Sequence, residues 1–179
     1  GLNLDLHSVH FGVAVSNPIT TLCSILAKVI DEDGRITVPH FYDDVEEVPA
    51  AEREMIAQIP FDEQKYMAAI NVKALKGEKG YSTLERNSCR PSFDICGIWG
   101  GYTGEGSKTV LPSKAYAKVS CRLVPHQNHE KISKLFVDYI NAVAPAYVTV
   151  KVTPMHGGEG YVCPITLPAY QAAEKGFAN

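Results

Sequence analysis

The chain has 179 residues, and 17 lysines and arginines against 20 aspartates and glutamates give it a net charge of −3 at neutral pH. This length suits one domain with a hydrophobic core of its own. A composition of 45% hydrophobic and 21% charged residues is near the globular average and excludes wholesale disorder, collagen-like repeats and a coiled coil. Nucleic-acid binders cluster lysine and arginine on one surface, and this acidic sequence has no such cluster, so we expect no nucleic-acid partner.

The sequence also limits where the protein resides and how its cysteines are used. No apolar run reaches the roughly 18 residues of a membrane-spanning helix, so we expect no membrane partner. The chain begins at Gly1 without a start methionine, and we expect it to be a piece of a longer parent protein. The localisation is therefore left open, with the cytoplasm slightly favoured. The absence of a C-x-x-C pair favours reduced, mostly buried thiols over disulfides or a cysteine zinc site at Cys23, Cys89, Cys96, Cys121 and Cys163.

The first predicted helix begins after Asn17, an N-cap residue followed by a proline at the first helical position. We expect the helix to end near Asp31, before a turn and a short extended run at residues 35–38. Four aliphatic residues recur at helical spacing and predict a face that packs on a sheet: Leu22, Ile25, Leu26 and Ile30.

Between residues 39 and 90 the sequence has no clear period and predicts an insertion. Two short helices are predicted within it, at residues 50–58 and 62–70, each preceded by a proline or an acidic capping residue. Glu46 and Glu47 could supply a base and a metal ligand. Adjacent residues point apart, however, and the stretch is typical of a charged surface.

The rest of the chain predicts two strands, a helix and a last strand. Residues 93–98 and 115–123 alternate apolar and polar side chains, as half-buried antiparallel strands do. Asn128 caps the helix, and residues 147–152 return as a strand. If residues 1–6 are the tail of a first strand, the order predicts an α+β fold of the ferredoxin-like kind. That fold is a two-layer sandwich in which a four-stranded antiparallel sheet carries two helices on one face.

Three features could carry chemistry. The glycine-rich loop at residues 100–106 is predicted to be a turn or a place where a substrate backbone approaches. His126 and His129 could share a metal, but no third ligand is evident near them, and a structural role is favoured. His7 lies at a bend after the first strand, where an imidazole could donate a hydrogen bond to a developing oxyanion. By residue type alone, a core or surface role for His7 is favoured.

Several short motifs are spread over nearly the whole chain. They are D-L-H-S at 5–8 with N-P at 17–18, R-P-S at 90–92, G-I-W-G-G-Y-T-G-E-G-S-K-T-V-L-P at 97–112, R-L-V-P at 122–125 and H-G-G at 156–158. Together they resemble the M20 metallopeptidase family. The order of the motifs and the insertion after the first helix are similar to the dimerisation (lid) domain of its carnosinase-like cytosolic dipeptidase branch.

The resemblance implies that the parent protein has two domains with different roles. Two zinc ions would be bound by a catalytic domain through His, Asp and Glu residues, and this chain would hold no cofactor itself. Residues 1–163 would form the lid domain, with the insertion at about 39–90, and residues 164–179 would begin the return to the catalytic domain. The implied partners are a second copy in a homodimer, the catalytic domain of the same parent chain, and a peptide or amino-acid-derived substrate.

The resemblance also implies roles for four residues. His7 matches the histidine that reaches into the partner subunit's zinc site and stabilises the oxyanion. Thr109 matches a residue that hydrogen-bonds the substrate, and Arg122 matches the arginine that holds the C-terminal carboxylate of the substrate. His156 matches a histidine that lines the same pocket.

The leading interpretation is the dimerisation domain of a di-zinc M20 dipeptidase or related amide hydrolase. Because the chain has no H-x-D zinc motif, we expect it to be inactive alone. One alternative is a stand-alone ferredoxin-like module that dimerises and binds a ligand or regulates another protein. A second alternative, an RNA-binding domain of the same topology, is disfavoured by the net charge and by the lack of an aromatic RNA-binding strand.

Overall fold

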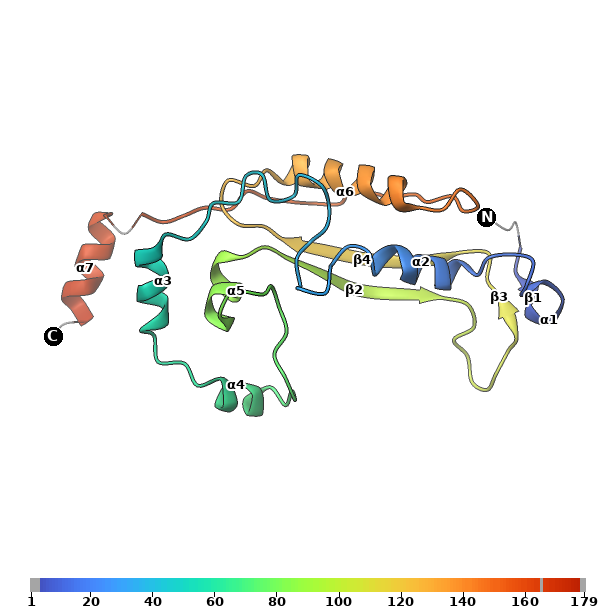
Figure 1. The fold of residues 1–179 in the computed structure, drawn as a ribbon, viewed down its shortest axis with the longest axis horizontal. Helices are drawn as coiled ribbons and strands as arrows, with labels where there is room; N and C mark the ends of the chain where they lie inside the picture. The colour runs from blue at the N-terminus through green and yellow to red at the C-terminus, as the bar shows by residue number, and fades with distance from the viewer. Residues whose placement is uncertain (1–3, 165, 178–179) are drawn as a thin grey trace.

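A long antiparallel pair of strands, β2 (Ser92–Gly100) and β4 (Ala115–Arg122), forms the centre of the computed structural model (Figure 1). The structure describes residues 4–164 and 166–177. The other elements are β1 (Leu6–His7), α1 (Ser8–Phe11), α2 (Pro18–Leu26), α3 (Ala50–Ala57), α4 (Glu63–Ala69), α5 (Thr83–Cys89), β3 (Val110–Leu111), α6 (His129–Val143) and α7 (Pro168–Phe177). The predicted α+β class is therefore confirmed.

The strands form two separate sheets of two strands each within the described residues, so the predicted single sheet of four strands is not confirmed. β1 pairs with β3 at one end of the β2–β4 ribbon. Residues 147–152, the predicted last strand, have no strand assignment, although Val150 and Val152 pack on the core. Alternation in a sequence reports which face is buried, and it does not identify the strand that supplies the hydrogen bonds.

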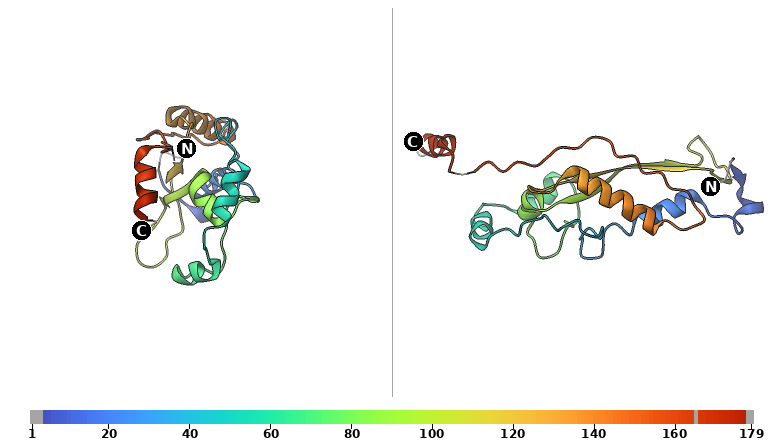
Figure 2. Two further views of the ribbon diagram at one scale, coloured as in Figure 1. Left: turned by 90° about the vertical axis from the view of Figure 1, so that its left-hand side faces the viewer. Right: turned by 90° about the horizontal axis from the view of Figure 1, so that it is seen from above.

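Two helices, α2 and α6, cover one face of the ribbon, as Figure 2 shows. The opposite face carries Trp99 and Tyr116, whose rings stack with centroids 5.4 Å apart and remain half exposed. The ribbon thus has one covered face and one open face. The core between the helices and the covered face is built from Ile25, Leu26, Val29, Ile36, Val38, Phe41, Phe93, Ile132 and Ile140.

The first of these helices, α2, begins as predicted, because the Asn17 side chain accepts a backbone hydrogen bond in its first turn. It ends at Leu26 and not near Asp31. The physical reason is that the carbonyl of Val29 accepts a hydrogen bond of 2.9 Å from the N–H of Thr37. This hydrogen bond pairs the backbone of Val29 with the extended run at residues 35–38, so the chain cannot continue as a helix there.

The insertion contains both predicted helices, α3 and α4, and a third helix, α5, that the prediction missed. The signal for α5 was present in the sequence. Ser82 and Glu85 form a reciprocal capping box, in which each side chain bonds the backbone N–H of the other residue. The seventh helix, α7, lies within residues 164–179, the predicted return segment, and stands apart from the ribbon (Figure 1). None of the described helices is long and apolar enough to cross a membrane.

The prediction of mostly buried thiols is wrong. Cys23, Cys96 and Cys163 are exposed, and Cys89 is half-buried. Cys121 packs against the core from the covered face of β4, and this burial raises the pKa of its thiol to about 11. For the four cysteines in helices and strands, exposure depends on the side of the element more than on residue type; Cys163 lies outside any helix or strand.

Candidate substrate-binding site

The D-L-H-S motif is held against the K-T-V-L-P-S segment by hydrogen bonds. The backbone N–H of Ser113 donates to the Asp5 carboxylate at 2.7 Å, and the N–H of Ser8 donates to the carbonyl of Thr109 at 3.2 Å. Between these contacts, His7 takes part in the pairing of β1 with β3. The hydrogen bonds from Ser113 hold the pKa of Asp5 below its usual value. Sequence reasoning missed this anchoring role of Asp5, since no local pattern connects residues so far apart.

The imidazole of His7 is exposed and has a defined orientation. Its Nδ1 accepts a hydrogen bond of 3.3 Å from the N–H of Val9, so the neutral ring carries its proton on Nε2. Nε2 lies 3.3 Å from the hydroxyl oxygen of Thr109. The ring of His10 packs edge-on against His7, with centroids 5.7 Å apart. An oriented Nε2–H donor beside a hydroxyl suits an oxygen on which negative charge develops.

Arg122 lies at the other end of the ribbon, where it ends β4 and stands opposite Ser92 in the register of the two strands. Its side chain is exposed and makes no hydrogen bond or ion pair among the described residues. A guanidinium in this state can grip a carboxylate with two parallel N–H groups.

His156 lies in an extended segment that runs along α6 (Figure 1). Gly157 approaches the start of α6 so closely that an added Cβ would stand 2.5 Å from Nδ1 of His129. The glycine of the H-G-G motif therefore permits this passage. Because α6 starts where the chain leaves β4, His156 belongs to the same end of the ribbon as Arg122.

The four predicted site residues thus form two groups. His7 and Thr109 meet at one end of the ribbon, and Arg122 and His156 belong to the other. From Tyr116 to Arg122 alone, β4 covers about 20 Å at 3.3 Å per residue. A dipeptide spans only about 7 Å. The two groups of one chain therefore cannot hold the same dipeptide.

No cluster of three or more His, Cys, Asp or Glu side chains that could hold a metal occurs among residues 4–164 and 166–177. His126 and His129 face different carboxylates. Nε2 of His126 lies 3.4 Å from Glu46, and Nε2 of His129 lies 3.9 Å from Glu159. The described residues therefore do not fit a zinc centre.

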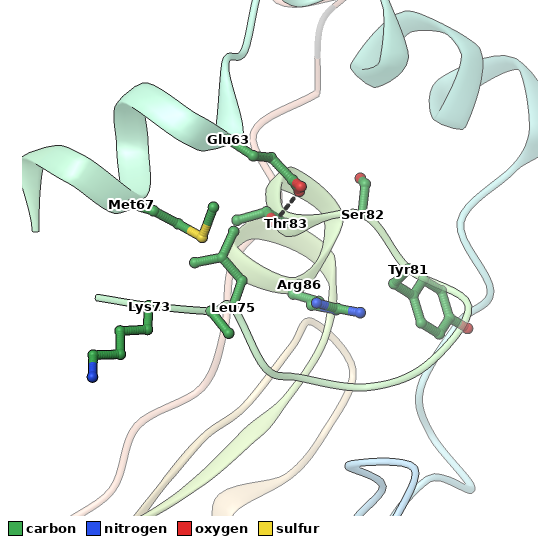
Figure 3. Close-up of a pocket in the computed structure, with 9 residues that line it drawn as sticks. Glu63, Met67, Lys73, Leu75, Tyr81, Ser82, Thr83 and Arg86 are labelled. Carbon is green, nitrogen blue, oxygen red and sulfur yellow. Dashed lines mark hydrogen bonds between the residues drawn. The ribbon is translucent and has the colours of Figure 1, made fainter. Parts of the chain in front are cut away.

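An open hollow of about 410 Å³ lies in the insertion (Figure 3). Within it the hydroxyl of Thr83 donates a hydrogen bond of 2.6 Å to Glu63. None of the four predicted site residues lines it, so it is not part of the candidate site. Its lining consists of Glu63, Met67, Lys73, Ala74, Leu75, Tyr81, Ser82, Thr83 and Arg86.

Comparison with known proteins finds a matching family model and relatives that are named dipeptidases. The family model of the M20 peptidase dimerisation domain matches residues 3–148. The Cys-Gly metallodipeptidase DUG1 of Candida albicans is 30% identical over 142 residues, which cover 79% of this chain and 29% of that protein. The human Beta-Ala-His dipeptidase is 33% identical over 141 residues, which cover 78% of this chain and 27% of that protein. The chain thus spans less than a third of the length of these two relatives.

A solved structure agrees with the sequence matches. The M20 family metallo-carboxypeptidase Sso-CP2 from Sulfolobus solfataricus is similar to this chain with a TM-score of 0.70 and 35% identity. The match covers 79% of this chain and 37% of that one. The family model spans most of the sequence, and the motifs carry the same resemblance. The chain therefore belongs to the peptidase dimerisation domain family of the M20 peptidases.

Proposed function

We propose that this chain is the dimerisation domain of a metal-dependent M20 dipeptidase or related amide hydrolase, and that it supplies residues to two substrate sites. One observation carries the proposal: His7 and Thr109 are separated from Arg122 by the length of the ribbon. In the proposed arrangement each end of the ribbon serves a different site.

A homodimer through the free edge of β2 would join the two ends. In the part of the chain that the structure describes, β2 pairs with β4 on one side only, and Ile95 and Ile98 on β2 are 47% and 46% exposed. Two edge strands related by a two-fold axis run antiparallel when they pair. The partner subunit's His7 would then lie beside Arg122, so one complete set of residues would form at each end.

The ferredoxin-like sheet belongs to the same proposal. Within residues 4–164 and 166–177, β4 pairs only with β2, and residues 147–152 keep an alternating burial pattern without pairing to a strand. A first strand, of which residues 1–6 are the tail, would fit between β4 and residues 147–152 and complete four strands. Residues 1–3 lie outside the described part of the chain.

In this proposal the residues of the chain bind and orient the substrate. His7 would donate its Nε2–H to the oxygen of the attacked amide, a contact worth about 3 to 4 kcal/mol when charge develops there. Thr109 would hydrogen-bond the substrate, and His156 would line the pocket around its C-terminal end. Arg122 would hold the free carboxylate, which accords with a relative named a metallo-carboxypeptidase.

The metal belongs to the catalytic domain of the proposed parent. Two relatives are named metallopeptidases, which supports metal-dependent hydrolysis, and we propose two zinc ions on the basis of the sequence resemblance. The described residues do not gather a ligand set for them. No chemical step is assigned to a metal on this chain.

The proposal is tested by Arg122→Lys in the full-length protein. Lysine keeps the charge but offers one donor where two parallel N–H groups would grip a carboxylate. We expect kcat/KM for a dipeptide with a free carboxylate to fall about 10- to 150-fold, since a charge-assisted hydrogen bond is worth roughly 1.5 to 3 kcal/mol. The C-terminal amide of the same dipeptide is the control and should be little affected. Equal loss on both substrates, or no loss on either, would contradict the assignment.

A further inference from the structure

We propose that Arg90 and Gln127 are positioning residues for Arg122, an inference that rests on the carboxylate-binding role proposed for Arg122. Arg122 stands opposite Ser92 in the last pair of residues of the ribbon. Arg90 lies two residues before Ser92, and Gln127 binds Val124, two residues after Arg122. The two buried side chains therefore hold both strands where the proposed substrate contact is made.

Arg90 is fixed by a buried carboxylate and two aromatic rings. Its side chain is 2% exposed, and its Nε and Nη2 donate to the two carboxylate oxygens of Glu78 at 2.7 and 2.8 Å. Glu78 is itself buried and accepts a further hydrogen bond of 3.1 Å from Arg35. The guanidinium carbon of Arg90 lies 4.3 Å from the ring centre of Tyr81 and 5.3 Å from that of Tyr42. A planar fork held in this way has a single orientation, which fixes the entry into β2.

The remaining nitrogen of Arg90, Nη1, is buried and has no hydrogen-bond partner among the described residues. Leaving a buried charged donor unpaired costs free energy. Buried ion pairs are, moreover, often no more stabilising than hydrophobic residues of the same size. The arrangement is therefore better explained by the geometry it imposes than by stability.

Gln127 is fully buried and fixes the chain that leaves β4. Its Oε1 accepts a hydrogen bond of 3.0 Å from the N–H of Val124, and its Nε2 donates to the carbonyl of Phe41 at 2.8 Å. Phe41 directly precedes Tyr42, whose ring lies over Arg90. The contacts of Gln127 and Arg90 therefore both reach the adjacent residues Phe41 and Tyr42.

The convergence makes residues 35–42 a common support for the two strand ends. The Arg122 side chain has no partner of its own in the described structure, so its position depends on the strand end that carries it. A displacement of about 1 Å in a positioning group can cost on the order of 10²-fold in rate. Weakening the contacts of Arg90 or those of Gln127 should therefore weaken recognition of the substrate carboxylate, although neither residue contacts the reacting atoms.

The experiment compares three variants of the full-length protein. Arg90→Lys removes the fork, and Gln127→Met keeps the length of the side chain but removes both hydrogen bonds. Arg53→Lys is the matched control, because Arg53 pairs with Glu85 and lies 5.2 Å from the ring centre of Tyr81 but contacts neither strand. We expect the first two variants to raise KM for the free-carboxylate dipeptide about tenfold. The kcat of these two variants and their KM for the amide analogue should change little. For Arg53→Lys, we expect little change in either kcat or KM.

A merely structural role gives a different result. If Arg90→Lys and Gln127→Met affect the acid and the amide alike, or if Arg53→Lys matches them, the inference is wrong. Arg122→Lys in the same assay separates the two proposals. If Arg122→Lys does not distinguish acid from amide, the proposed function fails; if it does so while the two positioning variants do not, only this inference fails.

A second measurement covers variants that fold poorly. Glu78→Gln retains the size of the side chain and weakens its hold on Arg90 and on Arg35, the two arginines that its carboxylate joins. We expect amide hydrogen exchange to become faster in residues 120–124 and to stay unchanged in residues 115–117 of the same strand. Unchanged exchange at both places would overturn the inference without any assay of activity.

Discussion

Nε2 of His7 lies 3.3 Å from the hydroxyl oxygen of Thr109, although 102 residues separate the two in the chain. The contact is made by the short pairing of β1 with β3 and by the hydrogen bond from Ser113 to Asp5. It joins two polar side chains into one unit at the end of the ribbon farthest from Arg122. This placement is why the proposed substrate site needs two subunits.

The 179-residue chain alone should not hydrolyse dipeptides, even with zinc added. The reason is that its described residues gather no set of three metal-ligating side chains. The measurement is amino-acid release from a panel of dipeptides, with the full-length protein as the positive control. Hydrolysis by the pure chain that a chelator abolishes would contradict this expectation.

Ile98→Lys should weaken self-association of the chain. Ile98 is 46% exposed on β2, and a lysine at a free sheet edge opposes edge-to-edge pairing. We expect the dimer dissociation constant, measured by sedimentation equilibrium, to rise about 30-fold, which corresponds to roughly 2 kcal/mol.

The control for this change is Ile59→Lys. Ile59 is 53% exposed, but it lies in the insertion, away from the ribbon edge. Its dissociation constant should equal that of the unmodified chain. Equal weakening by both variants, or a chain that stays monomeric at high concentration before any change, would count against dimerisation through β2.

Glu85→Gln should destabilise the chain near neutral pH and have little effect in strong acid. Hydrogen bonds from Arg53 and from the backbone of Ser82 lower the pKa of Glu85 to about 2. A folded pKa below the unfolded value of 4.5 contributes stability above about pH 5, and this contribution is lost as the pH falls towards 2. Because Arg53 is half-exposed, we expect a loss of only about 1 to 2 kcal/mol in the free energy of unfolding at pH 7.

Urea unfolding at pH 7, 4.5 and 2.5 measures this dependence. Glu54→Gln, at an exposed position of α3, is the matched control and should have little effect at any of these pH values. If the loss caused by Glu85→Gln is the same at pH 7 and pH 2.5, the ion pair with Arg53 does not stabilise the fold.

Elements set by local chemistry could be predicted from the sequence. Asn17 and Asn128 are confirmed as N-caps, because a cap depends on backbone donors only two or three residues away. The helix α4 follows from the same kind of signal, because Asp62 caps it, whereas α3 follows Pro49 and has no side-chain cap. The sheet could not be predicted in the same way, because the partner of β1 is a pair of residues more than one hundred positions away.

The candidate site shows the same limit. The family resemblance implied a donor role for His7, and its proximity to Thr109 emerged only from the fold. Glu78 and Gln127 were not singled out, and Arg90 entered only as part of the R-P-S motif without a structural role, because a buried polar residue in a loop interrupts no periodic pattern. Only the folded chain brings their partners together.

The central claim is that the partner subunit's His7 and a chain's own Arg122 act in one site. The most direct measurement mixes two full-length variants, His7→Ala and Arg122→Ala, each of which we expect to be nearly inactive by itself, and assays activity after subunit exchange. A hybrid dimer would contain one site with both residues intact and one with neither, so we expect recovery of about a quarter of wild-type activity when half of the dimers are hybrids. If both residues acted within one subunit, every site in the mixture would lack one of them, and no activity would return.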